Sequence, residues 1–225
     1  MATHHSQLYR SLRAVDPRDF QRIIRTYEER ENDIGRLDVT EHFELTVSYV
    51  NALFETGAYR RHQLMVEPVI EACIREDLRS APGVAGDVFT HLLFRKAAAA
   101  YNLRDFATAE HVTRELIRMH PARNRYTYFA RACLFHRKQR LLQFGRGAFI
   151  FMVLLTGLAT VGNLLVVRNF YAAYESGVRY LSGGLLLGGL LVLSVVYGYA
   201  LWSSHREARQ IQRAAANKRR SKGLH

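Results

Sequence analysis

The chain has 225 residues, apolar side chains at 48% of its positions and a formal net charge of +12. Such a charge is common in nucleic-acid-binding proteins, but here the excess is concentrated in residues 203–225, with seven basic residues and one acidic residue. No stretch interleaves aromatic and basic residues in the way that stacks bases, so we expect no nucleic-acid partner. The two cysteines have no CxxC or Cys/His spacing, which argues against a zinc site.

Residues 1–15 are expected to be a flexible N-terminus. Their polar start has no apolar signal-peptide core, so we expect no cleaved signal. A helical domain is predicted over residues 16–143. Pro17 suits the first turn of its first helix, where a missing N–H costs nothing. Apolar residues then recur at helical spacing. A turn is expected at Gly57, and a bend or a restart of the helix at Pro68.

Residues 88–121 have the pattern of a helical hairpin, in which two helices are joined by the short turn 102–105. Small and bulky residues and a following proline stand at characteristic positions: Leu93, Ala97, Tyr101, Phe106, Ala109 and Pro121. They resemble the tetratricopeptide repeat. The resemblance implies that these residues form the seam of the hairpin, where small residues let two antiparallel helices approach, a bulky residue fills the space and the proline stops the second helix. Arg104 departs from the family, which usually has a turn glycine at this place.

A more degenerate unit precedes it over residues 43–74. It has a similar turn, but His62 replaces the usual small residue, and the two units begin about 47 residues apart instead of the family's ~34. The resemblance implies a groove for an unidentified cytoplasmic protein partner, lined by the first helix of each pair. The expected groove-facing residues are Tyr49, Asn51, Lys96 and Asn102. A generic helical bundle is the alternative.

Two long apolar runs without a charged residue follow, at 148–167 and 180–202, and they predict transmembrane helices over residues 144–167 and 180–202. A helix needs roughly twenty apolar residues to cross a ~30 Å hydrocarbon layer, and both runs are long enough. We therefore expect an all-α protein, in which a cytoplasmic bundle of antiparallel helical hairpins is followed by a transmembrane helical hairpin. Residues 168–179 would form a short external loop and residues 203–225 a basic cytoplasmic tail. A pair of buried helices in a soluble core is the alternative.

More basic residues flank the outer ends of these runs than lie between them. They are Arg137, Lys138, Arg140 and Arg146 before the first run, and Arg206, Arg209, Arg213, Lys218, Arg219, Arg220 and Lys222 after the second. Basic residues are retained on the cytoplasmic side, so both termini are expected there. The same side chains would attract anionic membrane lipids. Arginine outnumbers lysine 28 to 4, which favours a GC-rich bacterial source and thus a bacterial inner membrane.

Glycines are frequent in both apolar runs. They are Gly183, Gly184, Gly188 and Gly189 in the second run, with Gly157 and Gly162 in the first. Small residues let helices approach closely in lipid. These glycines would either pack the hairpin internally or join copies of the chain into a homo-oligomer, and the pattern leaves both open. Neither run has an ionisable residue, which argues against an ion pathway within one subunit.

Catalytic motifs are missing from the sequence: there is no HExxH, no GxSxG and no phosphate-binding glycine loop. Arg131 and His136 have the Arg-x4-His spacing of HEPN-type ribonucleases, but this spacing arises readily by chance in an arginine-rich chain. We therefore expect no enzyme, no metal and no cofactor. The favoured function is a membrane-anchored scaffold or adaptor for protein interactions. The alternatives are an oligomerising two-span membrane effector that permeabilises the bilayer, and an accessory subunit of a larger membrane complex.

Overall fold

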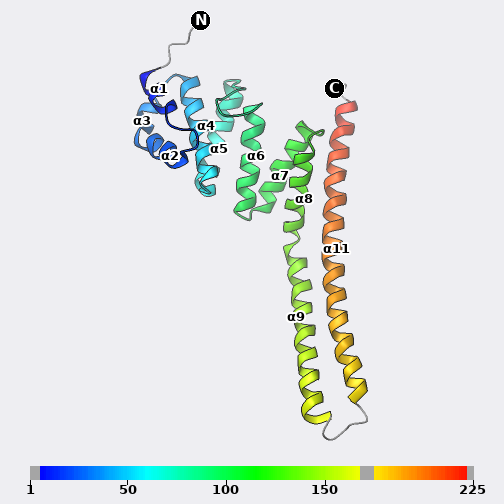
Figure 1. Ribbon diagram of the computed structural model, residues 1–225. Helices are drawn as coiled ribbons and strands as arrows, with labels where there is room; N and C mark the ends of the chain where they lie inside the picture. Colours follow the sequence, from blue (N-terminus) through cyan, green and yellow to red (C-terminus); the bar gives the residue numbers. More distant parts are fainter. Residues whose placement is uncertain (1–5, 168–174, 222–225) are drawn as a thin grey trace. The chain divides into compact units, whose positions relative to one another are not determined.

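A computed structural model of the chain describes residues 6–167 and 175–221 (Figure 1). All regular structure within these residues is helical, which confirms the predicted all-α class. The chain divides into two units. One holds the residues up to Cys133 together with the end of the last helix from Ala214 on, and the other is Leu134–Arg213.

The chain begins with three short helices: α1 (Gln7–Arg13), α2 (Phe20–Glu29) and α3 (Glu31–Ile34). Helix α1 thus lies within the segment 1–15 that was predicted to be a flexible N-terminus, and residues 1–5 of that segment are outside the described residues. Its N-terminus is capped by Ser6, which accepts a hydrogen bond from the Tyr9 amide. The Ser6 amide and hydroxyl both donate to Glu41, over 2.8 and 2.7 Å, and Tyr9 is buried. These contacts with a distant helix hold α1 in place.

Two helical hairpins follow, α4 (Val39–Glu55) with α5 (Tyr59–Arg75), and α6 (Val88–Asn102) with α7 (Phe106–Met119). Asp38, Asp87 and Asp105 cap three of these helices by accepting a hydrogen bond from a threonine amide two or three residues on. The predicted restart at Pro68 does not occur, because α5 continues through it.

The two hairpins have the same turn at an offset of 47 residues. The Ala58 amide donates to the Leu53 carbonyl, and the Asp105 amide to the Ala100 carbonyl, both over 2.9 Å. The residue before each donor has a left-handed backbone: φ is +78° at Gly57 and +63° at Arg104. In each hairpin an edge-to-face aromatic pair spans the turn, with ring centroids 5.5 Å apart: Phe54 with Tyr59, and Tyr101 with Phe106.

The buried residues of the two hairpins also match at an offset of 47 residues. Buried residues pair with buried residues along both helices: Leu45 with Leu92, Val50 with Ala97, Val66 with Thr113, Val69 with Leu116 and Ile70 with Ile117. Burying one large aliphatic side chain stabilises a fold by about 1.5–3 kcal/mol. The aliphatic residues at these matching positions therefore stabilise both hairpins in the same way. We conclude that the two hairpins are structural repeats.

The seam of the second hairpin continues onto helix α8 (Asn124–Arg137). Ala97 and Ala109 are fully buried. Ala109 belongs to a small cluster with Ala100 and Cys133, against which Tyr101 and Phe129 also pack. The remaining seam positions Leu93 and Phe106 are partly buried, and Pro121 follows the C-cap of α7.

The second unit contains an antiparallel helical pair. Helix α9 (Gln139–Gly162) runs into a π-helical turn, η1 (Asn163–Val167), and helix α11 (Glu175–Ser221) returns. The backbone of Lys138 separates α8 from α9. Two side-chain bonds join the pair: Lys138 Nζ donates to Ser203 Oγ over 2.6 Å, and Arg146 Nε to Tyr197 Oη over 2.7 Å.

Both helices contain a segment long and apolar enough to cross a membrane, Gln139–Leu165 and Ser176–Lys218. The predicted second run 180–202 and the described part of the basic tail are one continuous helix, because α11 extends to Ser221. Of the predicted loop 168–179, residues 168–174 lie outside the described residues.

Candidate functional site

A partly open cavity of about 250 Å³ lies against the first helices of the two repeats, α4 and α6. Its apolar wall comes mainly from α1, α2, α4 and the turns beside them: Leu12, Val15, Pro17, Phe20, Ile23, Tyr27, Leu45, Ala52 and Pro82. Its polar lining includes Ser48, Asn51 and Glu55 on α4, and His91 and Arg95 on α6. We call this space the apolar cavity.

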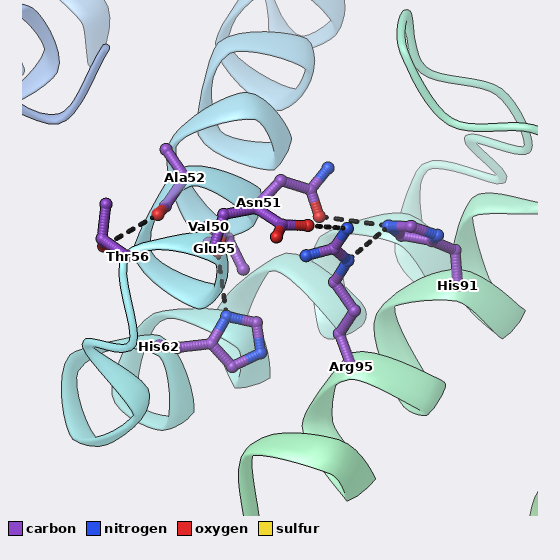
Figure 2. A network of polar contacts seen from close by, with 8 residues as sticks. All are labelled: Val50, Asn51, Ala52, Glu55, Thr56, His62, His91 and Arg95. Atoms are coloured by element: carbon purple, nitrogen blue, oxygen red, sulfur yellow. Dashed lines mark hydrogen bonds and ion pairs between the residues drawn. The ribbon is translucent and has the colours of Figure 1, made fainter. Parts of the chain in front are cut away.

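The polar side of the cavity is a connected network, shown in Figure 2. Arg95 forms an ion pair with Glu55, with Nη2 2.7 Å from Oε1, and its Nε donates to His91 Nε2 over 3.0 Å. The Arg95 guanidinium also lies over the Phe54 ring, 4.6 Å from the centroid. Asn51 Oδ1 lies 3.1 Å from His91 Nε2. Helices α4 and α6 are thereby joined by side chains of both.

The network keeps His91 uncharged. The pKa of His91 is lowered to about 4, chiefly by burial, with the nearby positive charges of Arg95 and Arg125 acting in the same direction. At neutral pH the ring is therefore neutral, and Nε2 accepts the hydrogen bond of Arg95 because a guanidinium only donates. In this tautomer Nε2 has no proton to donate to Asn51 Oδ1, which lies 3.1 Å from it.

A second histidine, His62 of α5, is fully buried behind this network (Figure 2). Its Nδ1 lies 2.9 Å from the Val50 carbonyl oxygen, which fixes the proton on Nδ1 because a carbonyl only accepts. Burial lowers the pKa of His62. His62 stands 47 residues before Ala109, so the first repeat has a buried imidazole where the second has a methyl group.

A smaller cavity of about 110 Å³ is also lined by His91. The other lining residues come from the start of α6, the end of α7 and the start of α8: Ala85, Asp87, Thr90, Phe94, His120, Arg123, Arg125 and Tyr126. We call it the arginine cavity. The Arg125 guanidinium lies 4.2 Å from the centroid of the Phe94 ring, and Arg123 Nη1 lies 3.5 Å from Tyr126 Oη. Because His91 lines both spaces, the two cavities adjoin.

One of the four expected groove-facing residues lines this site, namely Asn51. Tyr49 is instead buried, with its ring stacked on Tyr27 at 4.2 Å. Lys96 forms an ion pair with Glu67 of α5, and Asn102 donates to the Ala98 carbonyl of its own helix.

Sequence reasoning missed Ser48, Glu55, His91 and Arg95. Helical spacing carried a usable signal, because Ser48 and Glu55 lie three residues before and four residues after Asn51, on the same helix face. His91 and Arg95 show the same spacing of four. The pairing of these two faces could not be read from the sequence, since Asn51 and His91 are 40 residues apart.

The predicted packing glycines differ in their surroundings. A Cβ added at Gly189 would lie 2.9 Å from Met152 Cβ, so this glycine lies where α9 and α11 touch. Gly157, Gly162, Gly183, Gly184 and Gly188 have no described atom within 4 Å of such a Cβ. Gly145 was not among the predicted packing residues, yet its Cβ would lie 2.9 Å from Val196 Cγ1. The hairpin thus closes on Gly145 and Gly189.

The predicted basic residues lie on α8, α9 and α11, except Lys138, which lies between α8 and α9, and Lys222, which is outside the described residues. Several of them have partners on the hairpin. Lys138 lies 3.8 Å from Glu207 in addition to its bond with Ser203. The Arg206 guanidinium lies 4.5 Å from the centroid of the Trp202 ring, which is the pairing expected of a cation beside an interfacial aromatic residue.

Within the described residues, no three metal-ligating side chains come together. The two cysteines are buried and free, and burial raises the pKa of Cys133 to about 12, so its thiol is not activated at neutral pH. The arrangement of the two cavities is suited to holding a ligand by charge and apolar contact. Comparison of the chain with protein-family models, with curated proteins and with solved structures gives no match.

Proposed function

We propose that this protein is a membrane-anchored scaffold or adaptor that binds a protein partner in the groove formed by the two cavities. The observation that carries the proposal is a groove with an apolar wall and a polar network, set across two helical repeats. The same chain contains two helices able to cross a membrane. Repeated helical hairpins present extended surfaces of this kind to protein ligands.

Two features support a tetratricopeptide-like character of the repeats. Small residues occupy the seam of the second hairpin, with Ala97 and Ala109 fully buried. The first helix of each hairpin also contributes the groove residues, Asn51 from α4 and His91 from α6. The 47-residue offset is longer than the family's ~34, because the hairpin α4–α5 alone already exceeds that length and residues 76–87 then connect it to α6.

The membrane part of the proposal rests on length, composition and charge. The apolar segments match a ~30 Å hydrocarbon layer, and basic residues cluster at the outer ends of the hairpin. We propose a bacterial inner membrane with both termini in the cytoplasm. A reporter enzyme active only outside the membrane should work when inserted near Tyr174 and be silent at His225. The reverse pattern would overturn the orientation.

The binding function is tested by comparing, in cells, a variant whose apolar cavity is filled by a large side chain with a control variant. Ser48→Trp places a large ring in the cavity, whereas Glu71→Trp adds the same ring to an exposed position of α5 outside it. We expect in-cell cross-linking followed by mass spectrometry to recover a set of partners with the wild type and Glu71→Trp that is lost with Ser48→Trp. Both variants should remain in the membrane fraction. Identical partners for all three proteins would contradict a scaffold that uses this groove.

The membrane effector is a second candidate, favoured by the glycines that face away from the hairpin. Gly184 and Gly188 form a GxxxG pair with open space beside them, which is the geometry of a helix ready to pack against another copy. Liposomes that carry the wild-type protein separate the two candidates. A scaffold leaves an entrapped dye inside, and a reproducible leak that Gly188→Ile abolishes would favour the effector.

A further inference from the structure

The two cavities have different chemistry although they adjoin at His91. The apolar cavity has a wall of aliphatic and aromatic side chains, among them Leu12, Phe20 and Ile23. The arginine cavity is smaller and is lined mostly by polar and charged groups. A ligand that fills both must therefore combine an apolar part with a polar or charged part.

The charges beside the two cavities are balanced to different degrees. In the apolar cavity Arg95 is paired with Glu55, and Arg13 lies 3.7 Å from Glu44. In the arginine cavity neither Arg123 nor Arg125 has a carboxylate partner among the described residues.

One acid, Asp87, also lines the arginine cavity, so its single negative charge faces the two positive charges of Arg123 and Arg125. Asp87 accepts two hydrogen bonds from Thr90, one from its amide over 2.9 Å and one from its hydroxyl over 2.6 Å. The neighbouring His91 is neutral at pH 7, so it neither adds to nor offsets the charge of the two arginines. Two guanidinium groups thus remain available to an anion, and one of them is held in position by its contact with the Phe94 ring.

We propose that the groove binds an extended peptide segment of the partner that carries a large apolar side chain and an acidic side chain. The apolar side chain enters the apolar cavity, and the carboxylate binds Arg123 and Arg125 in the arginine cavity. This inference rests on the proposed scaffold function and names the class of its ligand. Adjoining cavities of opposite character favour an elongated peptide over a compact small molecule, because one short side chain cannot reach both.

The experiment uses the full chain in lipid nanodiscs and a phage-displayed library of random dodecapeptides. We expect the selected peptides to share an Asp or Glu together with a Leu, Ile, Phe or Met. A synthetic peptide from this set should bind less tightly as salt is added, because its carboxylate contacts exposed arginines. Selected peptides without an acidic residue, or no selected peptide at all, would overturn the inference.

Variants then locate the acidic contact. Arg125→Gln keeps a planar amide over Phe94 but removes the charge, and Arg60→Ala removes an exposed arginine of α5 that lines neither cavity. We expect Arg125→Gln to raise the Kd of the selected peptide about tenfold or more, and Arg60→Ala to leave it unchanged. An Arg125→Glu protein should prefer the peptide in which the acidic residue is replaced by Lys. An unchanged Kd for Arg125→Gln would overturn the acidic contact.

These outcomes separate the inference from the function on which it rests. If cross-linked partners depend on the apolar cavity but peptide binding ignores Arg125, the scaffold stands and the acidic peptide is wrong. If Ser48→Trp loses no partner, the scaffold itself fails, whatever the library yields.

Discussion

The hairpin α6–α7 and the hairpin α9–α11 both bring two antiparallel helices together at small residues, but for different physical reasons. In α6–α7 the buried alanines let the helices close over large apolar side chains such as Leu116 and Ile117, which are removed from water. In α9–α11 most large apolar side chains stay exposed, and the contact is made at Gly145 and Gly189. A hairpin in lipid gains its attraction from close packing itself. Small residues in α6–α7 thus allow large apolar side chains to be buried, whereas small residues in α9–α11 allow the two helices themselves to touch.

The largest loss of stability is expected at Gly189, where the neighbouring atom cannot move aside to admit a side chain. Gly189→Ile would place a branched side chain against Met152 Cβ, which cannot move without its helix. We expect the two helices to separate, at a cost of about 3 kcal/mol or more. Hydrogen exchange of α9 in nanodiscs should speed up markedly. Gly188→Ile is the matched control, since nothing described lies near that position, and equal exchange in both variants would contradict the assigned contact.

In the α6–α7 hairpin, overpacking should cost less because side chains around the seam can shift. Ala109→Leu adds three carbons at a fully buried position, and we expect a loss of about 1–3 kcal/mol in unfolding free energy. Thermal unfolding of the full chain, followed by hydrogen exchange in α6 and α7, measures it. The exposed Ala107 is a suitable control for the same substitution. Equal stability of both variants would mean that the seam is assigned to the wrong residues.

Acid should weaken the two repeats more than the α9–α11 hairpin. His91 binds protons less readily in the folded protein, where its pKa is about 4, than in the unfolded chain, where it is near 6.5. Stability is therefore complete above pH 6.5 and decreases as the pH falls towards 4. Burial lowers the pKa of His62 and adds a change in the same direction. The protection factors of the amides in α4 and α6, which correct the exchange rate for its intrinsic pH dependence, should fall as the pH is lowered over this range, and His91→Gln should flatten the dependence. If His91→Gln leaves the pH dependence of the protection unchanged, His91 is not the origin of the acid sensitivity.

The smallest effect is expected at the turn of the second repeat, and its sign is favourable. Arg104 has a left-handed backbone, which costs a residue with a side chain about 1 kcal/mol relative to glycine. Arg104→Gly should therefore raise the melting temperature slightly. Gly57→Arg is the mirror experiment in the first repeat and should lower it by a similar amount. A decrease for Arg104→Gly would show that the arginine side chain stabilises the turn by more than the backbone strain costs.

Much of the helical pattern followed from the sequence because apolar spacing and turn residues are local signals. The seam residues Ala97 and Ala109 were predicted from the resemblance to the tetratricopeptide repeat, and both are buried. The docking of α1 was missed because its anchor, Glu41, is 35 residues away from Ser6. The GxxxG pair was a poor guide to the hairpin contact, since Gly188 and Gly189 differ by about 100° around the helix and spacing alone does not say which side faces α9.

The arginine–tyrosine bond of the hairpin has a consequence for the thickness of membrane that the protein fits. A guanidinium stays out of hydrocarbon, so Arg146 and its partner Tyr197 mark one edge of the lipid core in the proposed membrane. About twenty helical residues separate Arg146 from Leu165, the end of the first apolar segment, which corresponds to ~30 Å. The residues from Gly198 to Trp202 then belong to the headgroup layer. A much thicker bilayer would have to thin locally around this hairpin, and the protein should therefore concentrate in membranes of ordinary or lower thickness.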